Sequence, residues 1–194
     1  MSAGAQRGRS GSVFRREDAL ALLHEYTQSE SLRKHALAVE CCVRAYAPAG
    51  EAELWGMTGL LHDFDYERWP NVPDHPLQGN KILTDLGYPE ELRHAILAHC
   101  EQTGAKRISP LDKTLFACDE LAGFLTACAL VKPNRTLAEV EIASVKRKLK
   151  DKAFARSVSR ADIEQGAREL ERPLEDHIAT CLEAMRGAAA ALGL

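Results

Sequence analysis

The chain has 194 residues, of which 45% are hydrophobic and 27% are charged, and its formal net charge is −3. This length suffices for one globular domain with a hydrophobic core and is marginal for two. The small negative charge implies no general attraction to nucleic acid or anionic membranes, and no stretch approaches the roughly 20 apolar residues of a membrane-spanning helix.

The six cysteines predict a reducing environment, since none of them forms a Cys-x-x-Cys pair. Most lie within apolar helical patterns, where a free thiol behaves as a small hydrophobic side chain. Residues 1–13 contain no apolar run of the kind that a secretory signal peptide needs. We therefore expect a cytoplasmic protein that makes no contact with a membrane.

The predicted elements are helices, after a disordered tail at residues 1–13 that is rich in Gly, Ser, Ala and Arg. Valine and isoleucine are sparse, and no stretch shows the sustained alternation of a strand. Residues 14–194 are therefore expected to form a single all-α domain. In chain order, the predicted helices span about 15–27, 30–47, 51–62, 75–86, 89–102, 110–131, 137–150, 160–171 and 173–192.

Capping residues and prolines support these boundaries. Ser109 can cap the helix that Pro110 opens, because a proline in the first turn lacks only an N–H that would have no helical partner. The one long irregular segment, 64–74, contains Pro70 and Pro73. Loops of this length in compact domains often carry function, which makes the segment part of a candidate site.

Helical phase separates the histidines in the first half of the chain, because each residue advances about 100° around the helix axis. His35 shares a face with Val39, and His99 shares a face with Ile96, so both imidazoles are predicted to point into the core. His94 lies about 140° from His99 and should face outward or sideways. A single inward histidine is typical of a core residue satisfied by a carbonyl or carboxylate, whereas two on different helices favour a binding site.

Asp119 is the second feature that indicates a site. Between Leu115 and Val131 the only charged residues are Asp119 and Glu120, so the predicted helix is apolar nearly all round and should be central. Burial of an unpaired carboxylate there costs several kcal/mol. The sequence leaves two explanations open: a buried salt bridge with an Arg or Lys, or a bound metal ion, which the inward histidines favour.

The third feature is the pair His62-Asp63, which ends the apolar run 54–61 just before the irregular segment. A His-Asp dipeptide is weak evidence by itself, but its place at the end of a buried helix strengthens it. Imidazole and carboxylate ligands together suit Mn, Fe, Zn, Co or Ni and tolerate Mg.

This pattern resembles the HD-domain superfamily of metal-dependent phosphohydrolases. A histidine on one helix, a His-Asp pair at the end of the next and a distant Asp on a later helix are typical of it. Residues 74–79 resemble its His-Pro-x-x-Gly turn, 83–89 with 95–99 resemble its next helix, and 119–121 resemble the segment with the last ligand. The resemblance covers roughly residues 30–130 and implies a compact helical bundle, with a helical extension on its C-terminal side.

The resemblance also implies roles for individual residues. His35, His62, Asp63 and Asp119 would hold one divalent metal, and His75 and His99 would be the extra ligands of members with a second metal. Six protein ligands are too many for one ion that keeps a position open for water, so a two-metal site is expected.

One departure affects the catalytic groups. Many members carry a lysine three residues after the paired aspartate, where this chain has Tyr66. Besides Asp63 itself, the acids Asp65 and Glu67 are therefore candidates to position a water or protonate a leaving group; the alternative is that both are solvated loop acids. Lys148 and Lys152, four residues apart on a predicted helix, are candidates to hold substrate phosphate, or else part of an ordinary solvated helix end.

The predicted function is metal-dependent hydrolysis of a phosphate ester of a small molecule, plausibly a nucleotide, by metal-activated water. Two alternatives remain at this stage: a di-iron oxygenase of the same superfamily, and a metal-containing ligand sensor without turnover. No general nucleic-acid binding is expected, and the oligomeric state is left open.

Overall fold

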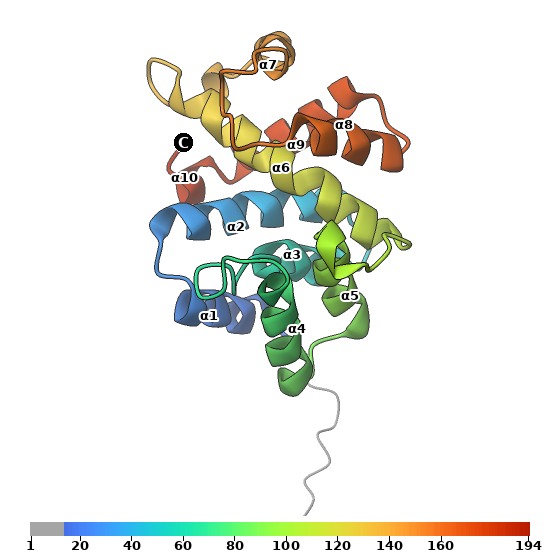
Figure 1. The fold of residues 1–194 in the computed structure, drawn as a ribbon. Coiled ribbons are helices and arrows are strands. Elements are labelled where there is room, and N and C mark those ends of the chain that lie inside the picture. Colours follow the sequence, from blue (N-terminus) through green and yellow to red (C-terminus); the bar gives the residue numbers. More distant parts are fainter. Residues whose placement is uncertain (1–13) are drawn as a thin grey trace, which may run out of the picture.

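The computed structural model describes residues 14–194, and within that range the regular structure is entirely helical, as the sequence predicts (Figure 1). The predicted tail at residues 1–13 lies outside the described residues. None of the described helices is both long and apolar enough to cross a membrane. The elements are α1 (Arg16–Tyr26), α2 (Glu30–Arg44), α3 (Ala52–Leu61), α4 (Asp74–Leu86), α5 (Glu90–Ala98), η1 (Glu101–Thr103), α6 (Pro110–Leu130), η2 (Leu137–Glu139), α7 (Ile142–Leu149), α8 (Arg160–Glu169), α9 (Leu174–Gly187) and α10 (Ala189–Leu192).

Helix α6 is central and packs against α2, α3, α5, α8 and α9 (Figure 1). The predicted cap is confirmed as a capping box: the Ser109 hydroxyl accepts from Asp112 N–H, the Asp112 carboxylate accepts from Ser109 N–H, and Pro110 is the first helical residue. The helix is buried along most of its length, with Phe124 among its fully buried side chains. A carboxylate facing the inside of the fold from this helix, such as Asp119, therefore needs a cationic partner.

Helices α2 and α3 pack closely because of a glycine. A Cβ placed on Gly59 would lie 2.9 Å from both the Cα of Glu40 and the carbonyl oxygen of Val39, which only a residue without a side chain permits. The close approach brings the C-terminal end of α3, where His62 is the C-cap residue, next to α2. The imidazole rings of His35 and His62 are consequently 5.2 Å apart between centroids.

Four predicted helices differ in detail. The helix predicted at 89–102 is divided into α5 and η1, because Cys100 has an extended backbone (φ −102°, ψ 110°). The helix predicted at 137–150 is divided into η2 and α7, because Val140 has an extended backbone (φ −85°, ψ 122°). The helix predicted at 173–192 is divided at Ala188 (φ −104°, ψ 7°) into α9 and α10. His75, predicted as a first helical residue, has a ψ of 131°. The proline that follows it excludes the helical region for the preceding residue, so the helix proper begins after His75.

A buried hydrogen-bond chain links α9 to α6 and to the segment after α2. His177 lies 2.9 Å from the Ala117 carbonyl through Nε2 and 2.7 Å from the Tyr46 hydroxyl through Nδ1. Because a carbonyl only accepts, the imidazole proton is on Nε2 and the Tyr46 hydroxyl donates to Nδ1. Burial lowers the pKa of His177, which keeps this histidine neutral.

All six cysteines are free thiols, four of them buried.

Candidate metal centre

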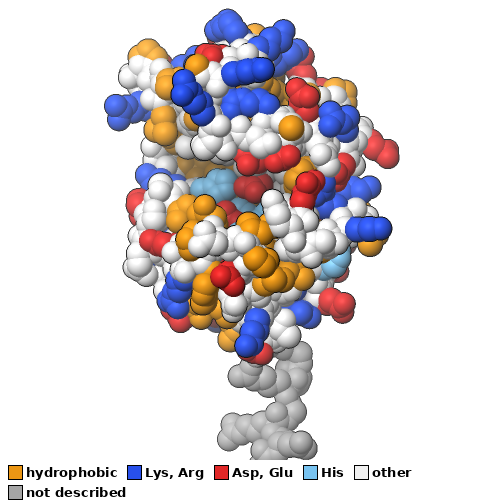
Figure 2. Space-filling model, viewed as in Figure 1, with side chains coloured by type: hydrophobic (Ala, Val, Ile, Leu, Met, Phe, Trp, Pro, Cys, Tyr) orange, Lys and Arg blue, Asp and Glu red, His pale blue; other side chains and the backbone are white. Residues whose placement is uncertain are grey.

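Five segments of the fold bring six imidazole and carboxylate side chains together in one cluster. Figure 2 shows histidine side chains (pale blue) beside acidic side chains (red) in a hollow near the middle of this face. The side chains are His35 from α2, His62 and Asp63 from the end of α3, His75 from the start of α4, His99 from the end of α5, and Asp119 from α6.

One half of the cluster lies between α2, α3 and α6. Asp119 Oδ1 is 3.0 Å from His35 Nε2 and 3.4 Å from His62 Nε2, and Asp63 Oδ2 is also 3.4 Å from His62 Nε2. One ligand atom from each of His35, His62 and Asp63 lies within 4.8 Å of the others, a spacing that a single ion can span.

The other half extends from the same carboxylate. Asp63 Oδ1 is 3.1 Å from His75 Nε2 and 3.5 Å from His99 Nε2, and these three residues form a second group within 4.8 Å. Asp63 thus belongs to both groups, with one oxygen directed to each side. A carboxylate in this position could bridge two metal ions.

The imidazoles are oriented by bonds on the opposite ring nitrogen. Nδ1 of His62 is 2.8 Å from the Gly59 carbonyl oxygen, and Nδ1 of His99 is 2.5 Å from that of Ile96. Because a carbonyl only accepts, each Nδ1 carries the proton, and in the neutral ring Nε2 presents a free lone pair to the cluster. This is the usual arrangement of a metal-binding histidine.

His62 provides the strongest test of whether a cation fits. Its Nε2 is fully buried and has no hydrogen-bond partner among residues 14–194, although two carboxylates lie 3.4 Å away. Within the same range, the ion pairs of Asp63 and Asp119 are all with histidines. The salt bridge with Arg or Lys that the sequence left open is therefore not observed here, and the nitrogen and oxygen ligands suit a divalent transition metal.

The charges in the cluster compensate one another when no metal is bound. Burial disfavours the charged form of each group, but hydrogen bonds and opposite charges within the cluster favour the charged form more strongly. Hydrogen bonds to Asp63 and Asp65 raise the pKa of His75 to about 9 against the effect of burial. Burial raises the pKa of Asp63, but His62 and the neighbouring imidazoles hold it well below its usual range. Protons thus occupy positions that a cation would take, and the two must compete.

Asp65 is placed differently from the catalytic role that the sequence suggested. Its side chain is 1% exposed, with Oδ1 2.7 Å from His75 Nδ1 and Oδ2 2.7 Å from Gly79 N–H. Both oxygens are therefore occupied within the fold, and Nε2 of His75 is left to face Asp63. This placement corrects the expectation: Asp65 orients a candidate ligand and has no free oxygen for water or a leaving group.

Glu67 also departs from its expected role. Its carboxylate accepts hydrogen bonds from the backbone N–H groups of Gln28 and Ser29, the latter at 3.1 Å, so it caps the start of α2. A carboxylate at this end of a helix is favourable because it meets unpaired N–H groups. Glu67 lies outside the cluster, and the suggestion that it acts in catalysis is corrected.

The two lysines expected to hold phosphate lie elsewhere. The ammonium group of Lys148 is 4.0 Å from the centroid of the Phe154 ring, and Lys152 lines a separate surface pocket with Arg160. Helix α7, which ends near both, packs against α6 and α9 (Figure 1). The structure does not bring these side chains to the cluster.

Two features in and beside the cluster were missed from the sequence. The orienting carbonyls of Gly59 and Ile96 lie three residues before the histidine they bind, a local signal that could have been used. Lys34 precedes His35 and lines a pocket beside it, which helical phase alone does not reveal. His94 is paired with Asp112 at 3.1 Å, outside the cluster, as helical phase predicts.

Comparison with known families agrees with this geometry. The family model described as HD domain matches residues 32–123. Residues 32–123 are therefore an HD domain. All six clustered side chains fall inside the matched residues, whereas α1 and α7 to α10 lie outside them. HD domains are generally found in metal-dependent hydrolases. No curated protein and no solved structure was found to match the chain.

Proposed function

We propose that this HD-domain protein is a metal-dependent phosphohydrolase that uses water to cleave a phosphate ester of a small molecule. The observation that carries the proposal is the cluster itself: six side chains of types that bind metals, in two groups that share the carboxylate of Asp63, with the buried Nε2 of His62 lacking a partner among residues 14–194. The side chains of Asp63 and Asp119 are 22% and 23% exposed, so a small molecule can reach the cluster from solvent.

The residues divide into two ligand sets. His35, His62, Asp63 and Asp119 would hold one divalent ion, and Asp63, His75 and His99 would hold a second. Such an ion, when bound, lowers the pKa of coordinated water and neutralises phosphoryl oxygens. The chain supplies the geometry: backbone carbonyls fix the rings of His62 and His99, and Asp65 fixes the ring of His75.

Preorganisation of these rings supports a hydrolase. Ligands held by second hydrogen bonds need not reorganise as charge develops on the transferred phosphoryl group. A nucleotide is the substrate class that the sequence analysis names; the lining and size of the pocket beside His35 favour a different one.

The test is phosphate release by protein stripped of metal and reloaded with Mn, Fe, Co, Ni, Zn or Mg. We expect at least one phosphate ester in a panel of nucleotides, sugar phosphates and alkyl phosphates to be hydrolysed. Asp63→Ala should abolish the activity while the helical circular dichroism persists. His94→Ala, a histidine outside the cluster, is the matched control and should stay active.

The same experiment separates the alternatives. Iron content with a mixed-valence spectrum and no phosphate release would favour the di-iron oxygenase, which the carboxylate shared between two ligand groups also permits. Tight metal binding without turnover of any compound would favour a sensor. Activity that survives Asp63→Ala would contradict the proposed site.

A further inference from the structure

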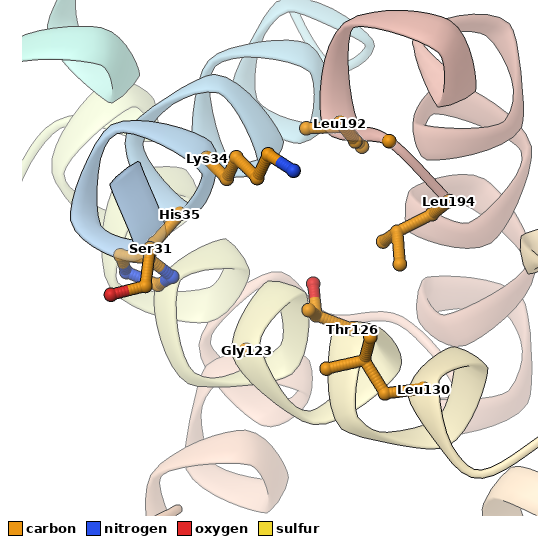
Figure 3. Close-up of a pocket in the computed structure, with 9 residues that line it drawn as sticks. Ser31, Lys34, His35, Gly123, Thr126, Leu130, Leu192 and Leu194 are labelled. Carbon is orange, nitrogen blue, oxygen red and sulfur yellow. The ribbon is translucent and has the colours of Figure 1, made fainter. Parts of the chain in front are cut away.

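A pocket of about 250 Å³ adjoins the metal centre (Figure 3). It lies between α2, α6 and the end of α10, and α10 packs directly on α2. The side chains and backbone that form most of its wall are those of Lys34, His35, Gly123, Thr126, Leu130 and Leu192.

His35 connects this pocket with the metal cluster. Its Nε2 faces Asp119 at 3.0 Å, and its other edge faces Gly123, where an added Cβ would lie 3.9 Å from Nδ1 and Cε1. The absence of a side chain at Gly123 keeps space open beside the ring. A molecule whose phosphate sits at the cluster could therefore place its organic part in this pocket.

The chemistry of the wall limits what this organic part can be. The end of the pocket away from His35 is formed by leucines, among them the half-exposed Leu130 and the buried Leu192 (Figure 3). The lining contains no Phe, Tyr or Trp ring and no carboxylate or carboxamide side chain. A nucleobase would find no Phe, Tyr or Trp ring to stack on, and the polar side chains of the lining are limited to Ser31, Lys34, His35 and Thr126. Hydrocarbon surface, in contrast, would be removed from water against the leucines.

The size of the pocket points the same way. Its volume of about 250 Å³ is below the roughly 300–1,000 Å³ of pockets that enclose drug-sized ligands. The group that enters must therefore be compact.

Lys34 adds a positive charge to the wall, which also carries the hydroxyl groups of Ser31 and Thr126. Its side chain runs along the wall from α2 toward Leu192 (Figure 3). The ammonium group lies where a Cβ on Gly193 would be only 2.8 Å away, so the glycine leaves room for it. In the described part of the chain, Lys34 forms no ion pair or hydrogen bond with another side chain. The ammonium group lies at the leucine end of the pocket, away from the edge of His35 that faces the cluster, and its methylene stem adds apolar surface to the wall.

We propose that this pocket binds the organic part of the substrate, and that this part is a short aliphatic group. The substrate class is then a short-chain alkyl phosphate in place of a nucleotide, given the phosphohydrolase function proposed above. Hydrolysis consumes one water, breaks the P–O bond to the aliphatic group, and releases an alcohol, which keeps the bridging oxygen and gains a proton, together with inorganic phosphate.

The first test measures kcat/KM of metal-loaded wild-type protein for methyl, ethyl, propyl, butyl and hexyl phosphate and for adenosine and thymidine 5′-monophosphates. Each methylene that enters the pocket should raise kcat/KM by up to about fourfold until the pocket is full. The nucleotides should be poorer substrates than butyl phosphate. A flat alkyl series, or a preference for the nucleotides, would overturn the proposal.

The second test measures the binding of ligands that the protein cannot hydrolyse. Calorimetric titration of the metal-loaded protein with the corresponding alkylphosphonates should show affinity that rises with chain length. Thr126→Phe, which fills the pocket, should flatten this dependence. Thr180→Phe, a change at a half-buried helical threonine that does not line the pocket, is the matched control and should retain it.

These readouts distinguish failure of the pocket from failure of the function. Chain-length-dependent phosphonate binding that Thr126→Phe removes, without hydrolysis of any ester, would support the pocket and contradict the phosphohydrolase. Hydrolysis of esters with no chain-length dependence would support the phosphohydrolase and contradict the role of the pocket. If Thr126→Phe does not fold, the wild-type series still decides, because it requires no variant.

Discussion

Replacing Asp65 by asparagine should weaken metal binding although Asp65 is not itself a member of the ligand cluster. The change keeps the size of a buried side chain but leaves it one acceptor oxygen. The wild-type carboxylate accepts from His75 Nδ1 and from Gly79 N–H, each at 2.7 Å. If the amide oxygen of asparagine accepts the hydrogen bond from Gly79 N–H, the NH₂ group of the same side chain faces Nδ1 of His75. Nδ1 must then accept, and the imidazole proton moves to Nε2, the atom that faces Asp63 at 3.1 Å.

The expected size of the effect follows from this change of tautomer. A protonated Nε2 cannot bind a metal ion. For His75 to bind, its proton must return to Nδ1, where it faces the NH₂ group of the asparagine, and this tautomer is unfavourable. Loss of such an orienting partner typically lowers metal affinity by about 10–100-fold, which corresponds to about 1.4–2.7 kcal/mol of binding free energy. The set formed by His75, His99 and Asp63 should be affected more than the set that contains His35.

The assay is calorimetric titration of metal-free wild type, Asp65→Asn and Glu67→Gln with Mn or Co, followed by kcat at saturating metal. Asp65→Asn should lose affinity for one ion and recover much of its kcat when metal is in excess. Glu67→Gln, at an acid two residues away that caps α2, should bind metal as the wild type does. Unchanged metal affinity in Asp65→Asn together with lost kcat would refute the orienting role and restore Asp65 as a catalytic acid or base.

Three further outcomes are expected. His99→Ala should lower the metal content of saturated protein from about two ions to one whereas His94→Ala should not, as measured by elemental analysis; equal metal content in the two variants would contradict the second ligand set. Gly166→Ala should destabilise the protein to urea by about 1–3 kcal/mol, because the new Cβ would lie 2.5 Å from an α6 backbone atom. Gly187→Ala, with nothing within 4 Å of its Cβ, is the control, and equal stability of both variants would refute the close packing. Burial lowers the pKa of His177 below its usual 6.5, so the unfolded chain binds this proton more readily than the folded protein. The contribution of His177 to the free energy of unfolding should therefore fall as the pH decreases from 6.5 through the folded pKa, so the difference in unfolding free energy between wild type and His177→Gln should change over that range in denaturation curves; a difference that does not depend on pH would refute this linkage.

Helical phase was informative because it is local. The directions of His35 and His99 follow from the 3.6-residue period of α2 and α5, and the central place of α6 follows from its nearly uniform apolar surface. These properties depend only on neighbours within one helix. They sufficed to anticipate that His35, His99 and Asp119 face a common interior, and that His94 does not.

The irregular segment after α3 could not be resolved in the same way. Asp65 and Glu67 are two residues apart and look equivalent in the sequence, yet one is buried against His75 and Gly79 and the other caps α2. Their roles depend on which backbone N–H groups the fold happens to bring near, and no periodicity encodes that. Likewise, the break at Val140 reflects burial of that side chain in the core, a tertiary effect that overrides helix propensity.

Part of the pocket wall comes from a different part of the chain than the candidate metal ligands. All the candidate ligands lie within residues 32–123, which match the HD domain, whereas Thr126, Leu130 and Leu192 lie beyond them. Because α10 packs on α2, the helix that carries His35, the wall supplied from outside the matched region is held directly against a metal ligand. The matched region would then provide the hydrolytic chemistry, and the segments that follow it would select the organic group. Substitutions at Leu130 or Leu192 should consequently change which ester is preferred without changing how many metal ions are bound.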